Sequence, residues 1–252
     1  MENMDVKNKS LHKALLILNC FTDKQELGVT EISEQLGLYK SNVFNILDTF
    51  KKMEYVEQNE DTGKYRLGIG VLRLSRALGD SFSITKIALP YMQEIANETN
   101  ERVYLGIPRE DEVLYLDATY PSNDIRLMRS LLGETAKMYC TGIGKAMMAF
   151  LPERLVEEYL QKPLEKFTEM TITDPEKLKK ELAVTRARGY AVDNMEHEFG
   201  VKCIGVPIFD RAGNIYAAMS ISGPSLRFSN ERMEQLYDLA KGYIRIIEDR
   251  IV

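Results

Sequence analysis

The sequence predicts an α+β protein with two domains and a connecting helix. The stretch 29–67 reads as two helices separated by a tight turn and followed by two short extended runs, which is the order of a winged helix-turn-helix. From residue 84 on, the predicted segments follow the order αβββαααβββα, which favours an antiparallel sheet with helices over a doubly wound parallel sheet. We therefore expect a winged helix-turn-helix domain over 1–68, a linker helix over 69–83 and an antiparallel sheet domain with helices over 84–252.

Two helices open the predicted N-terminal domain. The first covers residues 10–22, with Ser10 as the expected N-cap. The second covers 29–37, where Thr30 is the expected N-cap and Gly37 ends the helix. Helical spacing predicts that the first helix buries one apolar face, formed by Leu11, Leu15, Leu18 and Phe21.

The third helix and the hairpin complete this domain. The helix is predicted over 39–53, and two extended runs at 55–58 and 64–67 flank a turn in which Gly63 can adopt positive φ. The buried stripe of the helix is predicted to contain Val43, Ile46, Leu47 and Phe50.

The linker helix over 69–83 is amphipathic. Its apolar stripe, with Val71, Leu74 and Leu78, must be buried against another surface. This pattern indicates self-association.

The C-terminal domain is predicted to begin with a helix and to end with a long one. Pro175 fits the first position of a helix, and residues 211–213 fit a turn between two strands. The predicted helices are 85–100, 142–151, 153–160, 174–188 and one that starts at Ser229. The predicted strands are 103–108, 112–119, 124–131, 189–193, 203–210 and 214–222.

Composition excludes several classes of protein. The chain has 252 residues, 44% of them hydrophobic and 28% charged, which is typical of globular domains. No apolar run approaches ~20 residues, so we expect no membrane partner. The first ten residues lack the apolar core of a signal peptide, which favours a cytoplasmic location. Three widely spaced cysteines fit reduced thiols better than a disulfide framework.

The third helix carries the residues that suit contact with double-stranded DNA. The face opposite its apolar stripe is polar, and asparagine can pair with two atoms of adenine. Residues 1–80 hold 11 Lys and Arg against 12 Asp and Glu, so the basic character is local and not a property of the whole domain. A winged helix used only for protein contact stays open as an alternative. The candidate DNA-binding residues are Lys40, Ser41, Asn42, Asn45, Thr49, Lys51, Lys64 and Arg66.

Catalysis and cofactor chemistry find little support in the sequence. The run T-G-I-G-K at 141–145 lacks the first glycine and the final Ser or Thr of a phosphate-binding loop. Lys145 is therefore expected to be a lysine on the helix surface or a salt-bridge partner. The chain has only two histidines and no recognisable Ser/His/Asp set, so we expect no enzyme and no cofactor. A metal or redox sensor is a further alternative, although the spacing of its candidate residues matches no standard zinc motif. Those residues are Asp193, Glu196, His197 and Cys203, with Cys140 as a second thiol.

Over about residues 10–250 the chain resembles the IclR family of bacterial transcription regulators. The N-terminal motifs are S-L-H-K-A-L-L-I-L at 10–18, V-T-E-I-S-E-Q-L-G-L-Y-K-S-N-V at 29–43 and Y-R-L-G at 65–68. The more specific C-terminal motifs are C-T-G-I-G-K-A-M-M-A at 140–149, G-Y-A-V-D-N-M-E-H-E-F-G-V-K-C-I-G-V-P-I-F-D at 189–210 and A-A-M-S-I-S-G-P at 217–224.

The resemblance implies a DNA-binding regulator, more often a repressor, that assembles as a homodimer or a homotetramer and responds to a small-molecule effector. Its C-terminal domain would be related in fold to GAF and PAS domains, and its effector would be an organic or sugar-derived acid. The family often carries Arg where Asn45 stands, so the operator sequence does not transfer. By this resemblance the effector pocket is expected to use Ile125, Met128, Thr141, Gly142, Ile143, Asp193, Cys203, Ser220 and Ser222.

The residue types at those positions suit an acid ligand. Gly142 and Gly144 open a predicted helix, whose N–H groups favour an anion. Ser220 and Ser222 alternate along a predicted strand, so both hydroxyls face one side. Asp193 could orient a ligand hydroxyl and would disfavour a second negative charge beside it.

Overall fold

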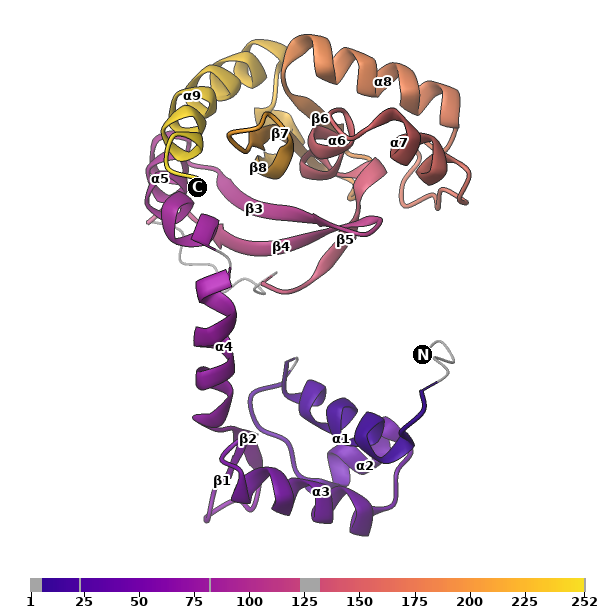
Figure 1. Cartoon of the computed structure of the whole chain (residues 1–252), viewed down its shortest axis with the longest axis vertical. Coiled ribbons are helices and arrows are strands. Elements are labelled where there is room, and N and C mark those ends of the chain that lie inside the picture. Colours follow the sequence, from indigo (N-terminus) through magenta and orange to yellow (C-terminus); the bar gives the residue numbers. More distant parts are fainter. Residues whose placement is uncertain (1–5, 23, 82, 123–131, 252) are drawn as a thin grey trace. The chain divides into compact units, whose positions relative to one another are not determined.

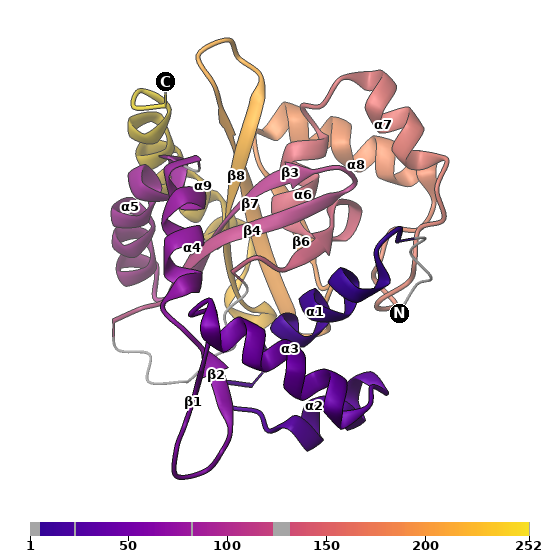
Figure 2. The same cartoon turned by 60° about the horizontal axis from the view of Figure 1, so that its bottom comes forward.

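The computed structural model describes residues 6–22, 24–81, 83–122 and 132–251. The chain divides into two compact units, residues 1–81 and 82–252, so that the expected linker falls largely within the first unit. Figures 1 and 2 show the elements of both units.

The first unit begins with helix α1 (Lys9–Asn19) and a 3-10 turn, η1 (Cys20–Thr22). The N-cap is Asn8, whose side chain accepts a hydrogen bond from the Leu11 N–H at 3.0 Å, so the prediction of Ser10 is wrong. The predicted buried face is also wrong in part, because Leu11 and Leu15 are 57% and 50% exposed. Two adjacent faces of α1 are apolar, and the one that packs inward carries Ile17, which is continued by Cys20 and Phe21 of η1.

Helices α2 (Val29–Leu36) and α3 (Lys40–Lys52) form the predicted helix-turn-helix. Gly37 ends α2 in the left-handed conformation, as predicted. The predicted N-cap Thr30 is wrong: Gly28 holds this position, and its N–H donates to the Glu31 carboxylate at 2.8 Å. The same carboxylate forms an ion pair with Lys64, which holds the start of α2 against the wing.

The wing consists of strands β1 (Val56–Gln58) and β2 (Tyr65–Leu67), paired antiparallel. Helix α4 (Gly70–Ser81) follows at once. A Cβ at Gly68 would lie 2.4 Å from the Glu54 carbonyl oxygen, so this close approach requires glycine. Leu72 and Leu74 of α4 are exposed within the unit. The buried residues of its core are Ile17, Cys20, Phe21, Leu27, Ile32, Val43, Leu47, Val56 and Tyr65.

The second unit is a single antiparallel sheet covered by helices on both faces (Figures 1 and 2). Its strands stand in the order β5-β4-β3-β8-β7-β6. They are β3 (Arg102–Arg109), β4 (Glu112–Thr119), β5 (Thr135–Lys137), β6 (Ala191–Asn194), β7 (Val201–Phe209) and β8 (Ile215–Pro224). The α+β prediction with an antiparallel sheet is confirmed.

Helices α5 (Ser83–Thr99) and α9 (Asn230–Glu248) pack on one face of this sheet. Helices α6 (Gly142–Met148), α7 (Glu153–Leu160) and α8 (Pro175–Arg188) cover the other face. Two 3-10 turns, η2 (Met138–Cys140) and η3 (Ser225–Arg227), complete the unit. The strand predicted over 124–131 lies outside the described residues. Among those described, no helix is both long and apolar enough to cross a membrane.

Candidate functional sites

The exposed face of α3 carries the predicted DNA-contacting residues. Val43 and Leu47 are buried against the rest of the unit, which turns the opposite side of the helix outward. The Thr49 hydroxyl donates to the Asn45 carbonyl oxygen at 2.9 Å, so its only remaining hydrogen-bonding capacity is as an acceptor. The residues that this arrangement exposes on one helix are Lys40, Ser41, Asn42, Asn45, Thr49 and Lys51.

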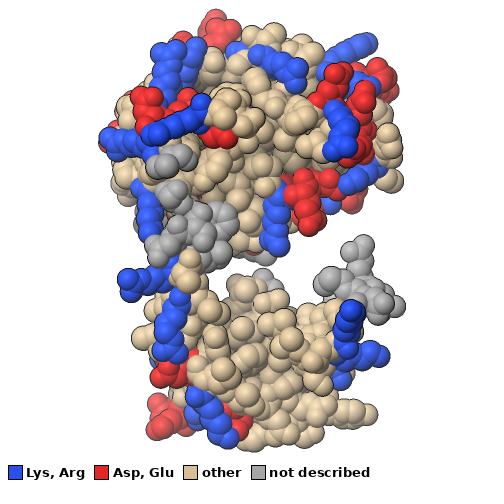
Figure 3. Space-filling model, in the orientation of Figure 1, with Lys and Arg blue, Asp and Glu red and all other residues tan. Residues whose placement is uncertain are grey.

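The two predicted cations of the wing are already paired with carboxylates. Lys64 Nζ lies 3.1 Å from Glu31 Oε2, and an Arg66 guanidinium nitrogen lies 3.1 Å from Glu57 Oε2. A phosphate would have to compete with these partners. Charged groups of both signs lie at the margins of this unit on the face that Figure 3 shows. Lys40 and Lys51 of α3 make no ion pair among the residues that the structure describes, so they are the predicted cations most available to a phosphate.

Two aromatic residues of this surface were missed in the sequence analysis. Phe44 is 51% exposed on the outer side of α3, and Tyr39, the N-cap, is 81% exposed. Because Val43 and Leu47 define the buried stripe of α3, helical periodicity already places Phe44 outside that stripe. The sequence could therefore have predicted that Phe44 is exposed. An exposed phenyl ring beside Lys40 and Asn45 can contact the methyl group of thymine.

A cavity of about 300 Å³ lies in the second unit between the sheet and the start of α6. It brings together residues from β3, β4, β6, β7 and β8 that lie far apart in the sequence. Ile125 and Met128 fall outside the described residues. The other seven predicted effector residues all line the cavity: Thr141, Gly142, Ile143, Asp193, Cys203, Ser220 and Ser222.

The floor of this cavity is a row of cross-strand neighbours, defined here as the polar row. Arg102 on β3 pairs with Ser222 on β8, Ser222 pairs with Cys203 on β7, and Cys203 pairs with Asp193 on β6. Directly opposed residues of antiparallel strands point to the same face. The polar row thus places a guanidinium at one end, a carboxyl group at the other, and a hydroxyl and a thiol between them. Tyr104 and Ser220 form part of the next row.

The start of α6 closes the cavity on one side. A Cβ at Gly205 would lie 2.0 Å from the Gly142 carbonyl oxygen. Only glycine at position 205 therefore allows α6 to lie this close to β7. The Thr141 hydroxyl accepts from the Gly144 N–H at 3.1 Å and donates to the Lys137 carbonyl oxygen at 3.1 Å. One of the helix N–H groups expected to face an anion is therefore already bonded, which leaves Arg102 as the stronger anion-binding group.

Asp193 has an unusual protonation equilibrium. One of its oxygens accepts from the Glu196 N–H at 2.7 Å, and the other lies 3.7 Å from the Cys203 thiol. Burial raises the pKa of Asp193 to about 7, an effect that this backbone hydrogen bond opposes and the nearby Glu196 carboxylate reinforces. Near neutral pH the group exists partly as a carboxylic acid, so it can donate to a ligand as well as accept.

Several cavity residues were not identified from the sequence. They include Arg102, Tyr104 and Tyr115, and His197, which was considered only for a metal site, lines the cavity as well. The rings of Tyr104 and Tyr115 meet edge to face with centroids 5.8 Å apart and form an apolar wall. Alternation along the β3 strand would have placed Arg102 and Tyr104 on one face, but the pairing of that face with Ser222 required the sheet order.

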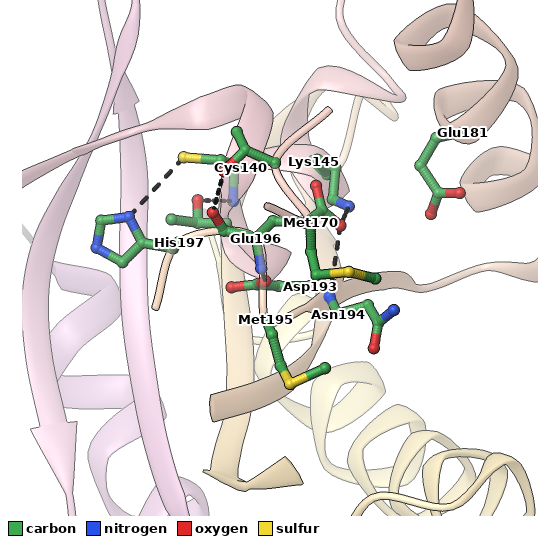
Figure 4. A network of polar contacts seen from close by, with 12 residues as sticks. Cys140, Lys145, Met170, Glu181, Asp193, Asn194, Met195, Glu196 and His197 are labelled. Carbon is green, nitrogen blue, oxygen red and sulfur yellow. Dashed lines mark hydrogen bonds and ion pairs between the residues drawn. The ribbon is translucent and has the colours of Figure 1, made fainter. Parts of the chain in front are cut away.

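The residues considered for a metal site do not converge. Glu196 turns to Lys145, and the His197 ring lies 3.8 Å from the Cys140 sulfur and packs on Phe167 (Figure 4). Within the described part of the chain, no three His, Cys, Asp or Glu side chains are placed to hold a metal ion. Burial raises the pKa of the Cys140 thiol to about 12 and that of Cys203 well above its usual value, which disfavours redox sensing through a thiolate.

The predicted surface position of Lys145 is wrong, although its alternative role in a salt bridge is correct. Its side chain is 0% exposed, and its ammonium lies 2.5 Å from Glu196 Oε1. Burial raises the pKa of Glu196, and Lys145 opposes that effect. An ion pair this deep connects α6 to the segment after β6.

Two family models together match most of the chain. Residues 10–60 match the IclR helix-turn-helix domain, and residues 77–247 match the C-terminal domain of bacterial IclR transcriptional regulators. The chain belongs to the IclR family. It is a DNA-binding transcriptional regulator with an effector-binding C-terminal domain.

Individual relatives are similar over nearly the whole chain. The HTH-type transcriptional regulator KdgR of Escherichia coli is 35% identical over 90% of this chain and 86% of its own length. The crystal structure of Thermotoga maritima IclR shares 35% identity and a TM-score of 0.84, covering 96% of this chain and 98% of that one. An IclR homologue from Microbacterium hydrocarbonoxydans, solved with 4-hydroxybenzoate, is 25% identical with a TM-score of 0.80, covering 96% of this chain and all of that one (100%).

Proposed function

We propose that this IclR-family regulator is a cytoplasmic repressor that acts as a homodimer or homotetramer. The exposed residues of α3 read operator half-sites, and the cavity in the second unit takes the effector. Repression needs only occupancy of the operator, whereas activation also needs a surface for the transcription machinery. The exposed apolar side chains of α1 and α4, Leu11, Leu15, Leu72 and Leu74, support assembly because they need a covering partner.

We further propose that the effector is a small hydroxylated carboxylic acid. The polar row supports this class because Arg102 offers a charged fork for a carboxylate, while Asp193 can bond a hydroxyl at the other end. Ser222, between these two groups, and Ser220, in the next row, provide hydroxyl partners. The 4-hydroxybenzoate held by the Microbacterium homologue carries these two kinds of group.

The cavity acts by binding and not by catalysis in this proposal. Its thiols, Cys203 and the nearby Cys140, are held in the protonated form by burial, so neither is an activated nucleophile. The effector alters operator affinity only if it binds the two states of the protein with different affinities. We infer that α4, which joins the two units in sequence, transmits this difference.

The double variant Ser220→Ala/Ser222→Ala tests the cavity. A thermal-shift screen of the wild type against small organic and sugar acids first identifies the effector, since a ligand at ~100 times its dissociation constant adds ~2.7 kcal/mol of stability. The double variant is expected to lose the effector's influence on operator binding and to keep operator binding without effector. Thr173→Ala, an exposed threonine outside the cavity, is the matched control. A normal effector titration in the double variant would refute the proposal.

A further inference from the structure

Helix α4 depends on few contacts to hold its direction within the first unit. Residues 72–77 are all exposed within that unit, so the body of the helix finds little support there. Its first turn is held by Glu54, which follows the C-cap of α3. The Gly70 N–H, at the start of α4, donates to the Glu54 carbonyl oxygen at 2.8 Å. One turn later, an Arg73 guanidinium nitrogen lies 2.7 Å from Glu54 Oε2. Glu54 thus holds α4 through its backbone and through its side chain.

The backbones at this joint are in close contact. A Cβ at Gly70 would lie 2.8 Å from the Glu54 carbonyl oxygen, and a Cβ at Gly68 would come even closer to the same atom. Glu54 itself has a φ of 64°, in the left-handed region that favours glycine. A residue with a side chain adopts this conformation at a cost in free energy, and it persists where the surrounding structure holds it. Here the conformation allows one residue to join the end of α3 to the start of α4.

We propose that Glu54 is a positioning residue that braces α4 against the end of the DNA-reading helix α3, so that the two helices move as one body. Helix α3 ends at Lys52, only two residues earlier, so a tilt of α4 reaches the DNA-contacting surface directly. Without the ion pair to Arg73, α4 can pivot about Gly68 and Gly70, and the joint absorbs the movement. This role rests on the proposed function, in which α4 transmits the effector's influence, and Glu54 is the contact that carries it.

Distance measurements by pulsed electron paramagnetic resonance on the full-length protein test the brace without any ligand. Spin labels at Glu34→Cys on α2 and Ser75→Cys on α4 occupy exposed positions on the two sides of the joint. The three native cysteines are buried, so they react slowly with the label, and excess unlabelled protein restricts the signal to distances within one chain. We expect a narrow distance distribution in this labelled parent and one about 1.5-fold broader when Arg73→Met is added, because only the side-chain part of the brace is lost.

A second variant, Glu54→Gly, separates positioning from stability. Glycine adopts positive φ without steric cost, which offsets the greater freedom of its unfolded chain, so this variant is expected to melt close to the wild-type temperature. It lacks the carboxylate that binds Arg73, so its distance distribution should broaden as in Arg73→Met. Asp48→Asn is the matched control, because it breaks an exposed ion pair of the same 2.7 Å length, with Lys52, that lies within α3. Its distribution should stay as narrow as that of the parent.

Operator binding tests whether the brace carries the effector's influence. The probe is whichever of D-gluconate, D-glucuronate, L-lactate and 4-hydroxybenzoate gives the largest thermal shift with the wild type. Its effect is the ratio of the operator dissociation constants with and without the acid. This ratio is expected to move about threefold toward one in Arg73→Met and in Glu54→Gly, since an exposed ion pair can contribute a factor of this size. The thermal shift itself, and the operator response of Asp48→Asn, should stay at wild-type values.

Each measurement has an outcome that contradicts the brace. Variants whose distance distributions are as narrow as that of the parent, or a parent distribution that is already broad, overturn it. A full operator response in both variants overturns its role in transmission. Failure of all four acids to bind counts against the proposed effector cavity instead, and the distance distributions then decide on the brace alone.

Discussion

Arg102 and Asp193 occupy opposite ends of the polar row, on strands β3 and β6, with Ser222 and Cys203 between them. Three strand spacings separate their backbones, roughly 14 Å, and both side chains line the same cavity. A positive group and a titratable carboxyl group therefore face each other across the space for one small molecule. This arrangement can distinguish the two ends of a ligand.

Replacing Arg102 tests the anion end of the cavity. Arg102→Gln is expected to weaken binding of an acid effector by about 2 kcal/mol, since it removes a charge-assisted hydrogen bond, and to leave folding intact. The thermal shift caused by the effector measures this loss. Arg109→Gln, at the exposed end of the same strand, is the control. An unchanged shift in Arg102→Gln would show that the carboxylate lies elsewhere.

The protonation of Asp193 predicts a specific dependence of stability on pH. Its pKa of about 7 in the folded protein exceeds the unfolded value of 3.8, so between these values the unfolded chain ionises while the folded protein keeps its proton. The contribution of Asp193 to stability therefore falls as pH rises across this window and is constant above it. Asparagine does not titrate, so the free energy of unfolding of Asp193→Asn, taken relative to wild type, is expected to rise by about 2 kcal/mol from pH 5 to pH 7. Urea unfolding at several pH values measures the gain, and a gain that shrinks with rising pH would contradict this assignment.

The buried pair of Lys145 and Glu196 predicts a strong effect of breaking it. Lys145→Met leaves a carboxylate without its partner in the interior and is expected to destabilise the protein by about 3 to 5 kcal/mol. The double variant Lys145→Met/Glu196→Leu should recover much of that loss, because both charges are gone. Lys179→Met breaks an exposed pair with Glu176 and should change stability by less than about 1 kcal/mol. Denaturant unfolding compares the three, and a loss in Lys145→Met no larger than in Lys179→Met would rule out a structural role for the buried pair.

The polar face of α3 predicts two kinds of loss in DNA binding. Lys40→Ala is expected to weaken binding to all duplexes similarly and to reduce the slope of log affinity against log salt by about 1. Asn42→Ala or Asn45→Ala is expected to reduce discrimination at one base pair by about 1 to 3 kcal/mol. Fluorescence anisotropy with the regulator's own promoter region and with random duplex separates these effects, with Lys180→Ala as control. Wild-type behaviour in all three variants would exclude α3 from the groove.

The exposure of Phe44 predicts sensitivity to the thymine methyl group. Replacing individual thymines of the operator by uracil removes only that methyl, and at one position this change is expected to weaken wild-type binding by about 1 kcal/mol. In Phe44→Ala the same replacement should have no further effect. Met53→Ala, which removes an exposed side chain just past the end of α3, should retain the wild-type sensitivity. A uracil effect that persists in Phe44→Ala would exclude this contact.

Local signals in the sequence predicted most of the described helices and strands, although not the short strand β5, because these signals depend on neighbouring residues. Gly37, Asp174 with Pro175, and Ser229 mark helix ends where the structure has them. The inward face of α1 was misassigned because two adjacent faces of that helix are apolar, and only packing decides between them.

Contacts between distant residues were less accessible to sequence reasoning. Burial of Lys145 depends on Glu196, 51 residues later, so no local pattern distinguishes it from a surface lysine. Arg102 joins the effector cavity through a strand pair that spans 120 residues. The serine alternation on β8 was correctly read because it needs only the period of one strand.

The pairing of Lys64 with Glu31 and of Arg66 with Glu57 has a consequence for the whole chromosome. We expect a wing whose cations keep these carboxylate partners to displace fewer ions from the DNA backbone, which lowers the attraction of the regulator to arbitrary sequence. Millions of competing sites then sequester little of the regulator. A modest number of copies in the cell can keep the correct promoter occupied.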